Sequence, residues 1–155
     1  MHVSDIFKGL GEDGFRELLR SISIGKLKTF QLYERVKARL HTPKLNTEAL
    51  RKAAPRSWQR INEGDAEFAT EISQAILVSH LDMIVAVLDL LGIPNEDGFF
   101  AKDLDGAKHL TEGWQTRVHE HFNGKYPEPL LVFYINHLAL EVQKAEEVYL
   151  PAPKA

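Results

Sequence analysis

The chain has 155 residues, a formal net charge of −3 and no cysteine, and 44% of its residues are hydrophobic. This length suits one domain with a sizeable core, and the lack of cysteine excludes disulfide bonds and thiol chemistry. The small net charge conceals two opposite segments, because residues 26–60 contain ten Lys or Arg and two Glu, whereas residues 61–155 contain six basic and sixteen acidic residues.

Helix-forming residues dominate most of the chain, whereas alternating β-branched stretches are nearly absent. We therefore expect an all-α protein, folded as a single compact helical bundle of about five to seven helices. The domain would span residues 1–150 and be followed by a disordered tail over residues 151–155.

The first forty residues predict three helical pieces. Glycines divide residues 4–24 into two short helices that begin at Ser4 and Asp13. Residues 26–40 follow as one longer helix with an apolar face and a basic face, and Pro43 marks its end.

The next segment predicts two short helices that meet at Pro55. Asn46 can cap the first helix, whereas Pro55 lacks a backbone donor and disfavours a helical conformation in the residue before it. Two helices joined by a tight turn can form a helix–turn–helix, in which four side chains would be able to reach base edges, namely Arg56, Ser57, Gln59 and Arg60. The segment therefore supports one hypothesis of nucleic-acid recognition.

The most apolar part of the chain predicts a central helix over residues 65–91, around which the other helices pack. Between residues 75 and 91, 13 of 17 side chains are apolar, which is typical of a helix buried on most sides. Asp65 can cap its start, and Gly92 can end it. Its two Asp residues and one His would be costly in lipid, so we expect no membrane span.

Two further helices are expected in the acidic part of the chain. Asp105 can open a helix that stops at Gly124. After a Pro-containing turn, residues 130–149 predict a final helix whose first turns are apolar nearly all round, so this helix is expected to be buried.

Polar residues interrupt the two most apolar predicted helices at His80, His137 and Glu141. If the two helices pack side by side, these groups could converge on Zn²⁺ or Fe²⁺, bind another small ligand or form an acid–base pair. The competing interpretation is a hydrogen-bonded structural histidine and a local His–Glu pair. Because the repeated His and carboxylate pattern of metal bundles is missing, we expect no cofactor.

The basic segment offers seven candidate contacts to nucleic acid: Lys37, Arg39, Lys44, Arg51, Lys52, Arg56 and Arg60. Clustered positive charge can bind phosphates, but it can also attract the acidic part of the same chain or simply face solvent. The direction in which these side chains point decides between the three interpretations.

No catalytic signature is present: the sequence contains no G-x-S-x-G elbow, Walker loop, G-x-G-x-x-G or H-E-x-x-H. We therefore expect a non-catalytic binding or interaction module, with self-association into a homo-oligomer left open. The absence of cysteine and of a signal-like N-terminus favours a cytoplasmic location.

Overall fold

The computed structural model describes residues 1–100 and 105–151. This part of the chain contains eight α-helices, one short 3₁₀ helix and no strand beyond isolated bridges, so the all-α prediction is confirmed. The contacts divide the chain into two units, a first unit of residues 2–79 and a second unit that starts at His80. The single domain stays a prediction, and the predicted disordered tail lies outside the described residues except for Pro151.

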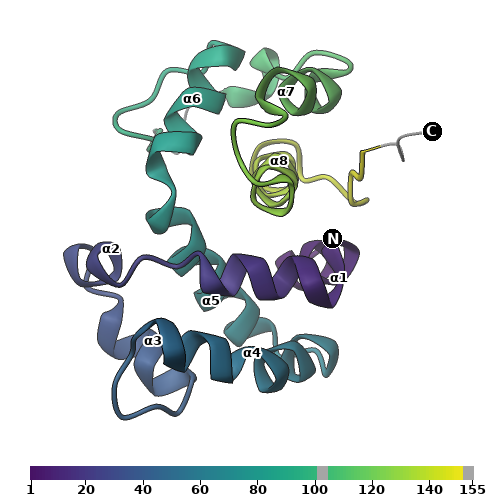
Figure 1. The fold of residues 1–155 in the computed structure, drawn as a ribbon. Helices are drawn as coiled ribbons and strands as arrows, with labels where there is room; N and C mark the ends of the chain where they lie inside the picture. Colours follow the sequence, from purple (N-terminus) through teal and green to yellow (C-terminus); the bar gives the residue numbers. More distant parts are fainter. Residues whose placement is uncertain (101–104, 152–155) are drawn as a thin grey trace. The chain divides into compact units, whose positions relative to one another are not determined.

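The first unit contains five helices (Figure 1): α1 (Val3–Arg20), α2 (Ile24–Thr29), α3 (Tyr33–Arg39), α4 (Thr47–Asn62) and α5 (Ala66–Ser79). Helix α1 packs mainly against α4 and α5. Their shared core contains Phe7 and Phe15, whose rings meet edge to face with centroids 5.1 Å apart. As the glycines predicted, α1 consists of two helical pieces, joined by a kink at Gly11 where φ is 80°.

Helix α4 continues through Pro55, so the predicted pair of short helices and the helix–turn–helix are wrong. Proline in a helix interior costs about 3 kcal/mol or more. The buried residues of α4 recur at helical spacing on both sides of the proline: Leu50, Ala54, Ser57 and Ile61. Burial of this continuous face against the rest of the unit offsets the local cost.

The predicted helix over residues 26–40 is also wrong, because the chain forms α2 and α3 with a break between them. Gln31 takes a left-handed conformation with φ of 61°. The Leu32 N–H donates to the Leu27 carbonyl at 2.7 Å, and the Gln31 N–H donates to the Lys28 carbonyl at 3.2 Å. These two bonds form a Schellman stop, which usually contains glycine at the left-handed position.

The predicted central helix over residues 65–91 is broken at His80 into α5 and α6 (Leu81–Leu91). The Ser79 hydroxyl donates to the Ala75 carbonyl at 2.7 Å and accepts the Ser23 N–H at 2.8 Å. A serine hydroxyl bonded to the carbonyl four residues earlier tends to bend a helix. No single described helix is long and apolar enough to cross a membrane, although α5 and α6 taken together reach that length and composition.

The two ends of the predicted central helix are confirmed. The Asp65 carboxylate accepts the Phe68 N–H at 3.1 Å and so caps the start of α5. Gly92 ends α6 with φ of 73°, and the Ile93 N–H donates to the Leu88 carbonyl at 2.9 Å.

The second unit contains α6, a 3₁₀ helix η1 (Gly106–His109), α7 (Trp114–Phe122) and α8 (Glu128–Gln143). The predicted helix from Asp105 to Gly124 is therefore wrong in its first half. Gly113, with φ of 79°, separates η1 from α7. Helix α8 contacts both α7 and η1, and seven successive residues in it, 130–136, are buried, as its apolar composition predicted.

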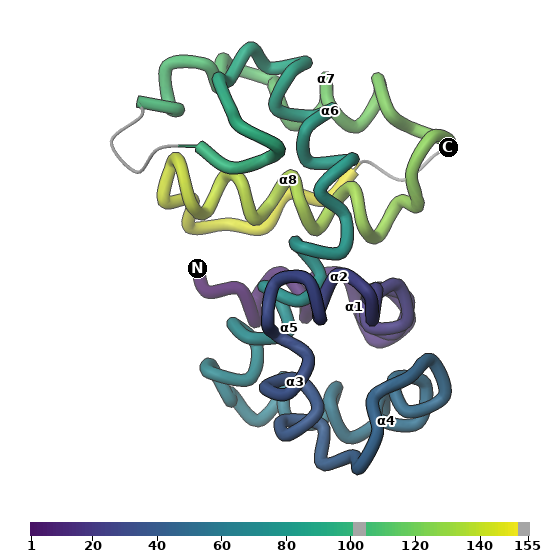
Figure 2. The backbone as a smooth tube through the Cα atoms, turned by 90° about the vertical axis from the view of Figure 1, so that its left-hand side faces the viewer, coloured from purple at the N-terminus to yellow at the C-terminus, as the bar shows by residue number. Residues whose placement is uncertain are grey.

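Helix α8 ends at Gln143 and does not reach Tyr149 as predicted. Lys144 takes a left-handed conformation with φ of 51°, and residues 144–151, here called the return segment, run back alongside α8 (Figure 2). The Asn136 side chain holds this segment by pairing with the Tyr149 backbone. A contact between residues 13 positions apart ends the helix where local propensity would continue it.

Candidate anion-binding site

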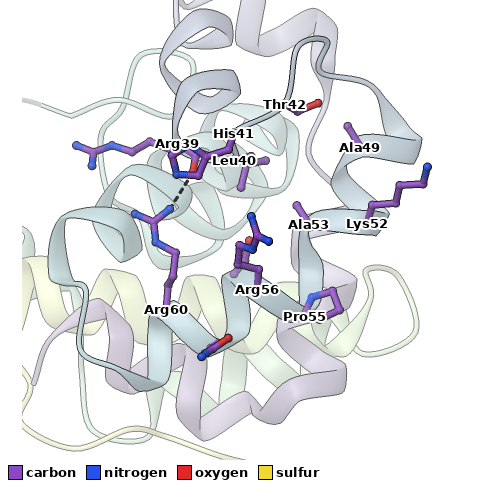
Figure 3. Close-up of a pocket in the computed structure, with 12 residues that line it drawn as sticks. Arg39, Leu40, His41, Thr42, Ala49, Lys52, Ala53, Pro55, Arg56 and Arg60 are labelled. Atoms are coloured by element: carbon purple, nitrogen blue, oxygen red, sulfur yellow. Dashed lines mark hydrogen bonds between the residues drawn. The ribbon is translucent and has the colours of Figure 1, made fainter.

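A pocket of about 550 Å³ lies in the first unit, between the end of α3 with its following loop and one face of α4 (Figure 3). Four Lys or Arg residues and one histidine contribute to its wall: Arg39, His41, Lys52, Arg56 and Arg60. None of the described residues that line the pocket is Asp or Glu. The pocket therefore combines a concave shape with side chains that favour an anion.

Helical spacing and a tight turn explain why these residues meet. Lys52, Arg56 and Arg60 follow one another at intervals of four on α4 and thus share a face of that helix. Helix α3 ends in a second Schellman stop, in which His41 has φ of 53° and the Thr42 N–H donates to the Lys37 carbonyl at 3.3 Å. This turn places the segment after α3 opposite the basic face of α4.

Arg39 belongs to the wall, but its charge is largely neutralised. Its Nε and Nη2 atoms donate to the two oxygens of Glu71 at 2.8 and 3.0 Å, and Glu67 lies 3.8 Å away. The hydrogen bonds to Glu71 raise the pKa of Arg39 above its usual range. In Figure 3 its guanidinium points away from Arg56.

Arg60 also has a structural role. Its Nε and Nη2 atoms donate to one Asp65 oxygen at 3.2 and 2.8 Å, and its guanidinium lies 4.0 Å from the centre of the Phe68 ring. Its Nη1 atom donates to the Arg39 carbonyl at 2.8 Å and so ties α4 to the end of α3. The hydrogen bond from Arg60, followed by the Phe68 N–H, lowers the pKa of Asp65.

Arg56 differs from both, because it forms no ion pair or hydrogen bond with any residue that the structure describes. It is exposed, and it extends from α4 towards Leu40 and His41 (Figure 3). Lys52 points outward from α4, and its amine lies 3.8 Å from Glu48. Arg56 is therefore the cation of the pocket that is available to a ligand without breaking an existing pair.

The remaining nucleic-acid candidates lie outside the pocket wall. Arg51 forms two hydrogen bonds with Glu48, which are the main cause of the lowered pKa of that carboxylate. Lys37 pairs with Glu34 at 2.9 Å. Lys44 is exposed and has no ion pair within the described parts of the chain. Because several of these charges are paired with carboxylates of their own unit, the basic segment is not one continuous unpaired surface.

His137 and Glu141 meet on α8, as their spacing predicted, with 3.6 Å between His137 Nδ1 and Glu141 Oε2. The His137 side chain is 20% exposed and stacks against Phe133, and its Nδ1 atom is buried without a hydrogen-bond partner in the described residues. Burial lowers the pKa of His137 to about 4 and raises the pKa of Glu141. The histidine is therefore neutral near pH 7, and the pair is not an ion pair there.

The third residue of the predicted metal site, His80, is half-buried at the junction of α5 and α6, and burial lowers its pKa. Within residues 1–100 and 105–151, no three His, Cys, Asp or Glu side chains are grouped so that they could hold a metal ion. The hypothesis of a shared metal site at His80, His137 and Glu141 gains no support from this arrangement.

Two polar residues of the pocket wall were missed from the sequence, namely His41 and Thr42. Local signals for the turn were weak, because His41 occupies a left-handed position that glycine usually fills.

Compared with models of known protein families, with curated proteins and with solved structures, the chain matches none.

Proposed function

We propose that this protein is a non-catalytic binding module that holds a phosphate group of its ligand in the pocket between α3 and α4. The observation that carries the proposal is the wall of Arg39, Lys52, Arg56 and Arg60 without an acidic residue among the described lining. Guanidinium groups match phosphate oxygens through charge-assisted hydrogen bonds. Arg56, with no competing partner in the described residues, is the proposed primary contact.

The surroundings of Arg56 favour phosphate recognition over recognition of a base. Arg60 is fixed by Asp65 and by the Arg39 carbonyl, so it can contribute a donor without reorganisation. The Arg39 Nη1 atom forms no hydrogen bond with the described residues. Among the described residues that line the pocket, none is Phe, Tyr or Trp, and base stacking on aromatic rings is the usual means of holding a single-stranded base. The ligand is therefore expected to be held by its phosphate.

A phosphate can come from a small phosphorylated molecule or from the backbone of a nucleic acid. Of the seven candidate contacts to nucleic acid, three are available to backbone phosphates because their charges are unpaired or only weakly paired in the described parts: Lys44, Lys52 and Arg56. Arg39, Arg51 and Arg60 are engaged by carboxylates. The experiment must therefore contain one probe for each source.

The test measures binding of inorganic pyrophosphate by calorimetry and of a labelled single-stranded DNA by fluorescence anisotropy. The variant is Arg56→Gln, and the control is Arg51→Gln, which removes an exposed charge from the same helix outside the pocket. Arg56→Gln is expected to weaken binding about tenfold, equivalent to about 1.4 kcal/mol, whereas Arg51→Gln is expected to leave pyrophosphate binding nearly unchanged.

The two probes distinguish the sources. Binding of both probes, with DNA affinity falling steeply between about 50 and 200 mM salt, indicates a nucleic-acid ligand. Binding of pyrophosphate alone indicates a small phosphorylated ligand. If neither probe binds at low salt, or if Arg51→Gln weakens binding as much as Arg56→Gln, the proposal is wrong.

A further inference from the structure

Asn136 binds the return segment through its backbone. The Tyr149 N–H donates to Asn136 Oδ1 at 2.6 Å, and Asn136 Nδ2 donates to the Tyr149 carbonyl at 2.8 Å. The second Nδ2 proton is donated to the Val132 carbonyl at 2.8 Å. Asn136 is 0% exposed, so its amide is a buried polar group whose donors are all satisfied only while an extended backbone lies against it.

Few other polar contacts with the described residues hold the return segment. The Tyr149 hydroxyl lies 3.3 Å from Thr116 Oγ1 on α7, and the Ala145 N–H donates to the Ala139 carbonyl at 3.2 Å. Glu146 and Glu147 are exposed, and Leu150 is 52% exposed. The segment is therefore attached mainly at Tyr149 and is otherwise open to solvent over much of its length.

The same residues have a second conformation available. Lys144, Ala145, Glu146 and Glu147 are good helix formers, which is why the sequence predicts a helix as far as residue 149. In the observed conformation Lys144 has φ of 51°, which is unfavourable for a residue with a side chain. Extension of α8 through these four residues alone would relieve that conformation and leave Tyr149 extended, but it would carry Tyr149 away from the buried Asn136 amide of its own chain, which would then lack its partner.

We propose that the return segment exchanges between two copies of the chain, so that Tyr149 of each copy pairs with Asn136 of the other. The occupant of the Asn136 site is then the same segment in the same register, with the tyrosine hydroxyl again beside Thr116. The exchange is reciprocal and closes after two copies, as twofold symmetry requires. Lys144 is the hinge, because it is the residue at which the extended helix and the observed turn diverge.

Mass action sets the conditions under which the exchange is visible. In the monomer the return segment competes with an effective concentration on the order of millimolar. The exchanged dimer is therefore expected to form at high protein concentration. Lys144→Gly, which makes the left-handed turn favourable, is expected to lower the dimer fraction about threefold or more.

Two complementary variants test the proposal. Asn136→Ala keeps the segment but removes the site, and Tyr149→Pro keeps the site but removes the N–H that binds it. Each variant alone is expected to be monomeric by light scattering, whereas an equimolar mixture is expected to form a 1:1 dimer by native mass spectrometry. In that dimer the segment of the Asn136→Ala copy occupies the site of the Tyr149→Pro copy.

A peptide provides a second readout in case Asn136→Ala fails to fold. A labelled peptide of residues 144–151 is expected to bind the Tyr149→Pro chain, and the same peptide with proline at position 149 is expected not to bind. The proposal is contradicted if the wild-type peptide does not bind, if the mixture stays monomeric, or if either variant alone dimerises as the wild type does.

Discussion

Glu71 holds the Arg39 guanidinium through two hydrogen bonds of 2.8 and 3.0 Å, although the two residues lie 32 positions apart. The pair is partly buried, with 33% of the Arg39 side chain and 17% of the Glu71 side chain exposed. Because Arg39 is part of the pocket wall, this carboxylate reduces the positive charge beside Arg56. Glu71 therefore limits how strongly the pocket can attract an anion.

Removal of that carboxylate charge is expected to strengthen anion binding. Glu71→Gln keeps a hydrogen-bond acceptor for Arg39 but removes one negative charge, so pyrophosphate affinity is expected to rise about twofold to fivefold at low salt. The control is Glu34→Gln, which removes the partner of Lys37 outside the pocket wall and is expected to change the affinity much less. Unchanged affinity in Glu71→Gln would show that Arg39 does not act on the bound anion.

The core of α6 is expected to be sensitive to truncation. Leu88 is 0% exposed and Ile84 is 4% exposed, so substitution of either by Ala is expected to lower the free energy of unfolding by about 2–5 kcal/mol. Asp82→Ala on the exposed side of the same helix is the control and is expected to change it by less than about 0.5 kcal/mol. Chemical denaturation measures the free energy of unfolding of all three variants. A decrease below about 0.5 kcal/mol in both core variants would contradict the assigned burial.

Replacement of Pro55 is expected to stabilise the protein. Because α4 is continuous across this position, Pro55→Ala restores a backbone donor inside the helix and is expected to raise the free energy of unfolding by about 1–3 kcal/mol. A decrease on chemical denaturation would indicate that the proline has a favourable role that the helical geometry does not reveal.

The buried His137 is expected to make stability depend on pH. Its pKa is lowered from 6.5 to about 4 in the folded chain, so the unfolded chain binds a proton at a higher pH than the folded chain does. The contribution of the neutral, buried His137 to the free energy of unfolding is fully present above pH 6.5 and is lost as the pH falls towards 4. Between pH 7 and pH 5 the loss attributable to His137 is about 2 kcal/mol.

The check for His137 is a comparison of denaturation curves at pH 7 and pH 5 for the wild type and for His137→Gln. Other titrating groups affect both proteins alike, so the variant is expected to lose less stability by about the amount assigned to His137. Equal losses in the two proteins would mean that the folded histidine titrates near its unfolded value.

Local signals predicted the parts of the fold that depend on neighbouring residues. Asp65 caps α5 and Gly92 ends α6, as expected from their side chains and conformations. The break at His80 involves the bond from Ser23 to Ser79, and the end of α8 depends on Asn136. Such contacts join residues that are distant in sequence, so periodicity and propensity alone could not reveal them.

The candidate site shows the same difference between what the sequence reveals and what depends on contacts between distant residues. Composition identified the basic segment and named Arg39, Lys52, Arg56 and Arg60. Which of these charges are neutralised depends on tertiary contacts, since Arg39 pairs with a carboxylate on α5 while Arg56 pairs with no described residue. The sequence could therefore predict the presence of positive charge but not its availability.

Nuclear magnetic resonance titration with pyrophosphate tests the proposed phosphate site most directly. We predict saturable shifts of the backbone amides of the pocket-lining residues 39–42, 49, 52, 53, 56, 57, 59 and 60, together with the Arg56 side-chain Nε–H, because these groups surround the pocket. The shifts should disappear in Arg56→Gln and persist in Arg51→Gln. No shifts at low salt, or shifts centred on other residues and unaffected by Arg56→Gln, would contradict phosphate binding in this pocket.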